Sequence, residues 1–293
     1  MRKEISFPAR FRVPRARFQN LYYYLRLSMY SWLQKKPVPP DAANVTKRAI
    51  ILKHLFVKGV ATPPPNHIAQ RMEQWNEDEK ANFISGVTRR SNQQIQQLQD
   101  SGLWHAMAES EQDFMQKGPT EVTEQSLIDA NWLAESAVCL LWALEYVSEL
   151  PPYDRRANPE LMNELPMRPV SILMKEAVLR SVDMIKKQRE LAELWHWRSR
   201  TRQLQELGRM PEVLVGGMTI DKVIKVSSVK AAEDGAFPSP IGDDFPALRK
   251  AYRDLNKEEF SLATSIAMER HRAFNWLCGY APGNRWENTP TET

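Results

Sequence analysis

Three ionisable side chains, Glu135, His196 and His271, occupy positions where the surrounding helical pattern predicts burial. Glu135 projects from an apolar helix, three residues after Trp132 and seven before Trp142. A buried carboxylate or imidazole needs a partner or a shifted pKa, because burial disfavours the charged form. A Glu–His pair tuned in this way could act as general acid and base, and two imidazoles with one carboxylate could hold a metal. These three residues are the weak candidates for catalysis.

The same residues also fit a structural role, as a buried polar network without catalysis. Glu135 would pair with Arg198 or Arg270, and the two histidines would bond to backbone groups or to Asn275. The three candidates come from different expected helices, and no ligand pair at short spacing, such as HxxxH or ExxH, supports a metal. We therefore favour the network and predict no catalytic residue, no metal and no cofactor. Its expected members are Glu135, His196, Arg198, Arg270, His271 and Asn275.

Missing signatures and cysteine usage narrow the function classes. The sequence has no phosphate loop, no GxGxxG, GxSxG or paired CxxC motif, and its 5 histidines have no recognisable spacing to a cysteine. The 2 cysteines, Cys139 and Cys278, lie in apolar helical patterns, which predicts buried thiols in a reducing compartment. No apolar run reaches about 18 residues, and the N-terminus lacks a clean secretory signal. We therefore expect a cytoplasmic protein.

Three long helices must position the candidate side chains. Residues 126–150 read as a helix that is apolar on nearly its whole circumference, so it should form the centre of the fold. Residues 170–207 and 257–278 carry the two histidines on apolar stripes. The predicted fold is mostly α, with a single multi-helix globular domain over residues 43–293 and a basic N-terminal appendage over residues 1–42.

Local patterns mark where other elements begin. The pairs Asn76–Glu79 and Asn256–Glu259 have the spacing of capping boxes, so each should open a helix. Residues 212–226 are rich in β-branched side chains around two glycines, which predicts one small β hairpin or an irregular insertion. Residues 243–255 should form a further short helix.

The N-terminal segment differs from the rest of the chain in charge. Residues 1–60 hold 13 Lys or Arg against Glu4 and Asp41, a net charge of +11, so the remainder carries −7 of the total of +4. Residues 18–33 have the pattern of a basic, aromatic, amphipathic helix that could dock on the chain's own surface or on an external partner. The expected partner-binding residues are Arg10, Arg12, Arg15, Arg17, Arg26, Trp32, Lys35, Lys36 and Trp276.

Several motifs together resemble a known family. They are Trp132-x-x-Glu135 followed by LLWAL and LPPYD, Leu179-Arg180, WHWRSR at 195–200, ERHRAFNWLCGY at 269–280, Trp286, and the closing Thr291-Glu292-Thr293. From about residue 45 to the end, the chain resembles the bacterial domain-of-unknown-function family four-two-seven-two, with the ERHxAxNWL block as the most specific part. The closing segment departs from the family's more acidic ending. The resemblance implies a helical fold and no particular mechanism.

We therefore expect a non-enzymatic cytoplasmic protein-binding module, an immunity or adaptor protein for a bacterial partner. The two separated charge fields favour steering and specificity, and the expected partner is another protein with an acidic surface. One alternative is an uncharacterised hydrolase or metal-dependent enzyme that uses Glu135, His196 and His271. Another is attachment to a membrane surface or to nucleic acid through residues 2–36. The sequence leaves the oligomeric state open.

Overall fold

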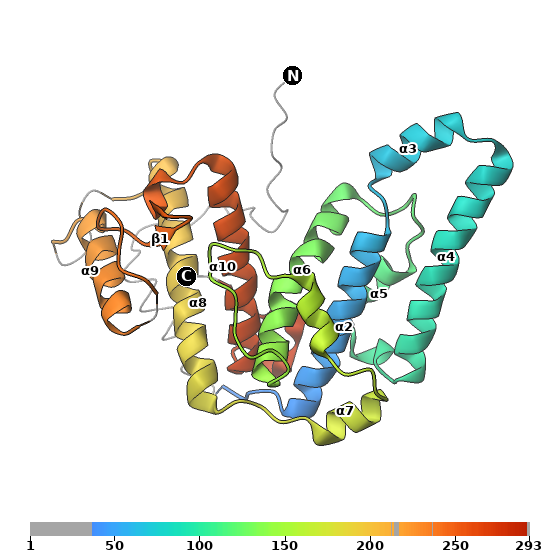
Figure 1. The fold of residues 1–293 in the computed structure, drawn as a ribbon, viewed down its shortest axis with the longest axis horizontal. Coiled ribbons are helices and arrows are strands. Elements are labelled where there is room, and N and C mark those ends of the chain that lie inside the picture. The colour runs from blue at the N-terminus through green and yellow to red at the C-terminus, as the bar shows by residue number, and fades with distance from the viewer. Residues whose placement is uncertain (1–36, 212, 214–216, 236, 292–293) are drawn as a thin grey trace. The chain divides into compact units, whose positions relative to one another are not determined.

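The computed structural model describes residues 37–211, 213, 217–235 and 237–291. These residues are mostly helical and contain one two-stranded antiparallel sheet, which confirms the predicted fold class (Figure 1). They divide into two compact units, each built around a pair of long helices. Unit 1 holds Pro40–Leu150 and Ala157–Arg180, and unit 2 holds Pro151–Arg156, the chain from Ser181 onward and the described end of Val13–Pro39. Residues 1–36 of the expected appendage lie outside the described part, so its boundary stays a prediction.

Unit 1 is centred on α2 (Ala42–Ala61) and α6 (Glu124–Ala143), which pack along each other (Figure 1). A Cβ atom on Gly59 would lie 2.7 Å from the Cβ of Ala130, so glycine permits this close approach. Every residue of α6 from Leu133 to Ala143 is buried, as the all-round apolar pattern predicts. α6 is thus the core helix of its unit.

The end of α6 differs from the prediction. The helix stops at Ala143 rather than at residue 150, because Glu145 adopts a left-handed conformation with φ of 66°. Arg180 binds two carbonyls at this end: its backbone amide donates to Ala143 O at 2.9 Å, and its Nε donates to Trp142 O at 2.7 Å. The helix terminus therefore holds a segment that is distant in sequence.

That contact also explains why the helix predicted over residues 170–207 is wrong as a single element. The structure has α7 (Val170–Glu176) and α8 (Val182–Glu206), with extended chain between them. Arg180 lies in the break, where its bonds to the end of α6 replace the helical bonds of its own backbone. The side chain of Ser181 then caps α8 by accepting from the Met184 amide at 3.4 Å.

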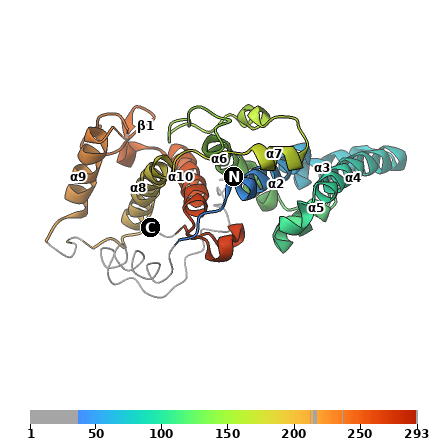
Figure 2. The ribbon, with the colours of Figure 1, turned by 90° about the horizontal axis from the view of Figure 1, so that it is seen from below.

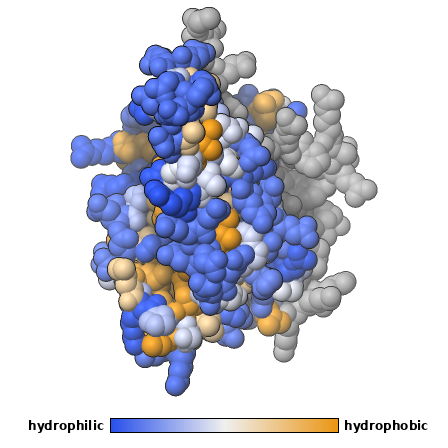
Figure 3. Space-filling view, turned by 90° about the vertical axis from the view of Figure 1, so that its right-hand side faces the viewer, coloured by the Kyte–Doolittle hydropathy of each residue, from blue (hydrophilic) through white to orange (hydrophobic). Residues whose placement is uncertain are grey.

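The outer part of unit 1 contains shorter or more exposed helices. They are α3 (Pro65–Gln74), α4 (Glu77–Asp100), α5 (Glu109–Gln116) and the 3-10 helices Trp104–Ala106 and Pro159–Glu164. The capping box predicted at Asn76 is confirmed. α4 buries only Val87 and Leu98, and its outward side belongs to a largely hydrophilic surface (Figure 3). A shallow hollow there is lined by Ser85, Thr88, Arg89, Asn92, Gln93 and Gln96.

A buried lysine ties the outer helices to α2. The Nζ of Lys58 donates to Met115 O at 2.8 Å and to Lys117 O at 2.7 Å, which are carbonyls at the C-terminal end of α5. It also donates to Ser91 Oγ on α4 at 3.2 Å. Burial lowers the pKa of Lys58 to about 8, while the charge of Glu121 acts in the opposite direction. One ammonium group thus joins three helices.

Unit 2 is centred on α8 and α10 (Lys257–Leu277), which lie side by side in both ribbon views (Figures 1 and 2). They run antiparallel, since Arg189 bonds to Asn275 whereas His196, further along α8, faces the earlier His271. The capping box predicted at Asn256 is confirmed as the start of α10. The chain then continues through the 3-10 helices Pro282–Asn284 and Trp286–Asn288.

A hairpin over residues 212–226, one of the two predictions for that segment, is wrong, because its second half is helical. Residues 220–226 belong to α9 (Ile220–Glu233). Helical spacing buries Ile220 and Ile224 there, and this burial outweighs their β propensity. The hairpin instead joins β1 (Pro246–Ala247) to β2 (Lys250–Ala251), and the 3-10 helix Tyr252–Asp254 follows. The short helix predicted over residues 243–255 is therefore also wrong. None of the helices in the described ranges is long and apolar enough to cross a membrane.

Candidate functional site

Two of the candidate catalytic residues face each other inside unit 2. The Nδ1 atoms of His196 on α8 and His271 on α10 are 3.0 Å apart, and their rings meet edge to face. Both side chains are buried, His196 to 3% exposure and His271 to 0%. The helix periodicity that placed each imidazole on an apolar stripe thus brings the two together in the α8–α10 interface.

The neighbours of the pair determine which nitrogen carries each proton. Asn275 Oδ1 accepts from Arg189 Nε at 2.9 Å, and Asn275 Nδ2 donates to the Pro290 carbonyl at 2.9 Å, so the amide orientation is fixed. The second proton of Nδ2 then goes to His271 Nε2 at 3.0 Å, which makes that nitrogen an acceptor. His271 in its neutral form must therefore carry its proton on Nδ1 and donate it to Nδ1 of His196.

Both imidazoles are held neutral. Burial lowers the pKa of His196 to about 3, and the positive charge of Arg200 adds to the effect. Burial also lowers the pKa of His271 well below its ordinary value, with further contributions from His196 and Arg189. His271 uses both nitrogens in this chain of bonds, and His196 uses its Nδ1 lone pair. Accepting a proton at these atoms would break the pairing.

Glu135, the third candidate, belongs to unit 1. It is 0% exposed on α6, and its Oε1 accepts from the backbone amide of Ala157 at 2.6 Å. The structure therefore gives this buried carboxylate a local backbone donor within its own unit. In the described part of the chain, no three His, Cys, Asp or Glu side chains gather as a set of metal ligands. The acid/base and metal hypotheses that combine Glu135 with the histidines stay predictions.

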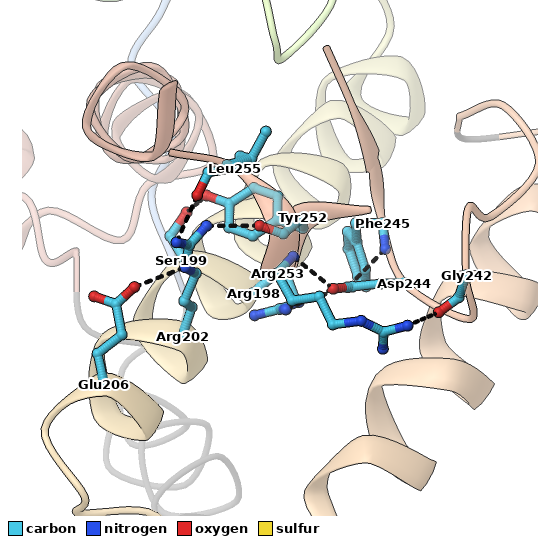
Figure 4. A network of polar contacts seen from close by, with 10 residues as sticks. All are labelled: Arg198, Ser199, Arg202, Glu206, Gly242, Asp244, Phe245, Tyr252, Arg253 and Leu255. Atoms are coloured by element: carbon cyan, nitrogen blue, oxygen red, sulfur yellow. Dashed lines mark hydrogen bonds and ion pairs between the residues drawn. The ribbon is translucent and has the colours of Figure 1, made fainter. Parts of the chain in front are cut away.

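The carboxylate partner of Arg198 is Asp244, not Glu135 (Figure 4). Arg198 donates from Nε and Nη2 to the two carboxylate oxygens, each at 2.7 Å, and both side chains are 1% exposed. Asp244 also accepts from the backbone amides of Phe245 at 2.7 Å and Arg253 at 2.9 Å. Burial by itself would raise the pKa of Asp244, but the bonds and charge of Arg198, with the two amides, lower it. The pair is therefore charged.

Asp244 stands between two tight turns of unusual backbone conformation. The first turn pairs Ile241 with Asp244 and has φ of 54° at Gly242 and 64° at Asp243. The second connects β1 and β2, with φ of 52° at Leu248 and 63° at Arg249. Positive φ at both central residues is the pattern of type I′ turns, which normally use Asn and Gly there. In the second turn, two ordinary side chains occupy left-handed positions, which costs about 1–2 kcal/mol per residue.

Each turn is held by a side chain. The Nη2 of Arg253 donates to the Gly242 carbonyl in the first turn (Figure 4). In the second, Asp154 Oδ2 accepts from the Leu248 amide at 2.8 Å. Asp154 is itself carried by a loop that Arg270 binds, through the carbonyls of Pro151 and Arg155. Fixed side chains thus hold both left-handed turns from outside the turns themselves.

A second layer of contacts supports the segment after the hairpin. Tyr252 shares a 2.6 Å hydrogen bond with Ser199, and the guanidinium of Arg198 lies 4.9 Å from the centre of its ring. Arg202 donates to the carbonyls of Tyr252 at 2.7 Å and Leu255 at 2.8 Å (Figure 4). The side chains come from two successive turns of α8, which is therefore the scaffold for this segment.

Of the expected partner-binding residues, the structure describes only Trp276. Trp276 was expected on a contact surface, but its indole is 3% exposed, donates to the Asn284 carbonyl at 2.9 Å and meets Trp286 edge to face. It is a core residue, so that expectation is corrected. The remaining ones, Arg10, Arg12, Arg15, Arg17, Arg26, Trp32, Lys35 and Lys36, lie outside the described residues.

Sequence reasoning missed Asp244, Asp154 and the two turns. The only local signal is Gly242-Asp243, a pair with turn chemistry. Leu248-Arg249 carries no such signal, because neither residue favours a left-handed backbone. Asp244 and Asp154 are ordinary aspartates in the sequence, and their partners lie 46 and 94 positions away.

The chain belongs to the family described as Domain of unknown function (DUF4272), whose profile matches residues 32–219, more than half of the sequence. The match includes α2, α6 and α8. It ends before α9, the clamped turns and the C-terminal ERHxAxNWL block that carried much of the resemblance seen in the sequence. Comparisons with curated proteins and with solved structures give no match.

Proposed function

We propose that this DUF4272 protein is a non-enzymatic, cytoplasmic protein-binding module of the immunity or adaptor type. The observation that carries the proposal is the pair of clamped turns, in which Asp243, Leu248 and Arg249 are held with positive φ although none is glycine. Such strain persists only where the surrounding structure enforces it, and it is concentrated at functional sites. Here it fixes the shape of a loop at the surface, where Asp243 and Arg249 are exposed.

The groups that enforce this shape are themselves costly to bury. A buried ion pair such as Arg198–Asp244 gives little net stability compared with apolar residues of the same volume, because both charges lose their hydration. Here the pair holds the backbone between the two turns, because Asp244 accepts from the amides of Phe245 and Arg253. A loop that is ordered before binding loses less conformational entropy on binding, so a partner is held more tightly for the same contacts.

The buried histidines support a structural role over catalysis. Their hydrogen bonds run from Arg189 through Asn275 to His271 and His196, and each nitrogen in the chain has its donor or acceptor role assigned by its neighbour. A general base must offer a free lone pair to a substrate proton. The lone pairs of His271 Nε2 and His196 Nδ1 are already occupied within the α8–α10 interface.

The proposal is tested by affinity capture from the host with variants that loosen a turn. Asp154→Ala removes the acceptor of the Leu248 amide while leaving the side chains of the hairpin in place. Arg168→Ala, in an exposed ion pair with Glu176 in unit 1, is the matched control. We expect the wild type and the control to retain the same partner near one-to-one stoichiometry, and Asp154→Ala to retain less of it at unchanged helix content. Recovery of the wild type alone, or equal recovery with all three proteins, would contradict the proposal.

A further inference from the structure

We infer that the β1–β2 tip and the 151–156 loop form one recognition surface for an acidic segment of a partner protein, with Arg155 and Arg249 as its charged contacts. The inference rests on the proposed function and gives it a partner chemistry. Its geometric basis is the hydrogen bond from the Leu248 amide to Asp154 Oδ2, at 2.8 Å. Arg249 follows Leu248 in the chain and Arg155 follows Asp154, so both arginines lie next to this hydrogen bond.

Both arginines are exposed, and within the described ranges neither guanidinium has a hydrogen bond or an ion pair. The other basic residues of the hairpin region are already engaged. Lys250 pairs with Glu259 at 2.7 Å, and Arg253 binds the Gly242 carbonyl. Arg155 and Arg249 are therefore the cations at this tip that remain available to a ligand.

The backbone under each arginine is fixed although the side chains reach into solvent. The Arg155 carbonyl accepts from Arg270 Nη2 at 3.1 Å, and Arg270 is 1% exposed with its guanidinium 4.8 Å from the centre of the Tyr153 ring. Arg249 is fixed by the left-handed turn and by the register that pairs Ala247 with Lys250. Binding would therefore order only the two side chains, since the main chain is already in place.

The chemistry of the two groups favours carboxylates on a protein. Guanidinium presents a planar fork of donors that matches a carboxylate in bidentate fashion, and arginine is enriched in protein interfaces. Nucleic acid is bound through a row of cations that follows the phosphate backbone, and an anionic membrane surface through clusters of about four or more. Two available arginines beside a half-buried Leu248 do not make such a row. A short segment with two Asp or Glu residues and an apolar side chain fits the surface better.

The test is a titration of the full-length protein against a fluorescently labelled peptide of repeated Asp-Glu-Leu units, followed by anisotropy. An Asn-Gln-Leu peptide controls for charge, and Arg168→Ala controls for the loss of an exposed arginine elsewhere. We expect Arg155→Ala and Arg249→Ala each to weaken binding of the acidic peptide by about threefold to tenfold, as for charge-assisted contacts at a surface. The double variant should weaken it further, and the control should leave it unchanged.

Equal affinity of wild type and double variant for the acidic peptide would overturn the inference. So would binding to a single-stranded DNA oligonucleotide, or to phosphatidylserine-containing vesicles, that is tighter than peptide binding and is lost in the double variant. The same variants in the host capture separate the two claims. A partner that is retained equally by the double variant leaves the protein-binding function standing and refutes the acidic-segment surface.

Discussion

Removing one member of the Arg198–Asp244 pair should destabilise unit 2 strongly. In Arg198→Met the charged Asp244 keeps two backbone amide donors but loses both bonds to guanidinium. In Asp244→Ala the guanidinium, 1% exposed, is left without its carboxylate, and the amides of Phe245 and Arg253 lose their acceptor. Breaking a buried pair costs about 3–5 kcal/mol, and each unsatisfied buried amide adds about 1–3 kcal/mol. We therefore expect about 3–5 kcal/mol for Arg198→Met and more for Asp244→Ala.

The double variant distinguishes a paired charge from a simple sum of contacts. When Arg198→Met has already removed the cation, the further change Asp244→Ala only takes the acceptor away from the amides of Phe245 and Arg253. The combined loss in free energy of unfolding should therefore fall short of the sum of the two single losses by at least about 2 kcal/mol. A cycle that is additive within about 0.5 kcal/mol would show that the two charges do not depend on each other.

Urea unfolding at pH 7, monitored by tryptophan fluorescence and far-UV circular dichroism, measures these losses. Trp195 reports on the region directly, because its ring centre is 5.5 Å from that of Phe245. Arg168→Ala serves as the reference, since its ion pair is 47% and 53% exposed and should contribute less than about 1 kcal/mol. Single-variant losses below about 1 kcal/mol at Arg198 or Asp244 would refute the reasoning.

Three further predictions concern stability. Gly59→Ala places a Cβ 2.7 Å from that of Ala130 and should lower the free energy of unfolding in urea by about 1–3 kcal/mol. The control Gly86→Ala, in α4 with nothing within 4 Å, should instead raise it by about 0.5–1 kcal/mol. Equal effects of the two changes would contradict the tight α2–α6 contact. Lys58→Met leaves three acceptors without their donor and should lower the thermal midpoint while making α5 more susceptible to limited proteolysis; an unchanged cleavage pattern would argue against the link. The paired histidines have folded-state pKa values below the unfolded value of about 6.5, so the unfolded chain binds more protons as the pH falls. The free energy of unfolding should therefore be at its full value above about pH 6.5 and fall by up to about 1.4 kcal/mol per histidine for each pH unit below it. The urea midpoint at pH 7 and pH 5 checks this, and His271→Gln should reduce the dependence on pH.

The features that the sequence predicted are local ones. The capping boxes at Asn76 and Asn256 formed because an Asn side chain and the Glu three residues later satisfy each other's neighbouring amides, whatever packs around them. The burial of Glu135, His196 and His271 followed from helical periodicity, which decides the face of a helix on which a residue lies. Cys139 and Cys278 are buried for the same reason.

Periodicity could not identify partners. His196 meets His271 across 75 positions, and Arg198 meets Asp244 across 46, so both pairings depend on the alignment of α8 with elements formed much later in the chain. Glu135 was one candidate partner for Arg198 in the sequence because both are charged and buried. Charge sign alone cannot choose among several buried carboxylates.

The helical character of the described chain, several helix starts and the buried helix faces could all be predicted from the residues, since these features depend on neighbours within about one helical turn. Three features depend on long-range packing: the break of the helix within residues 170–207, the position of the hairpin, and the left-handed backbone of Leu248 and Arg249. In each case a distant group outweighs local preference. Carbonyls at the end of α6 draw Arg180 out of a helix, and Asp154 holds the Leu248 amide in a turn. Such bonds exist only once the chain has folded, so no window of sequence around either residue contains the information.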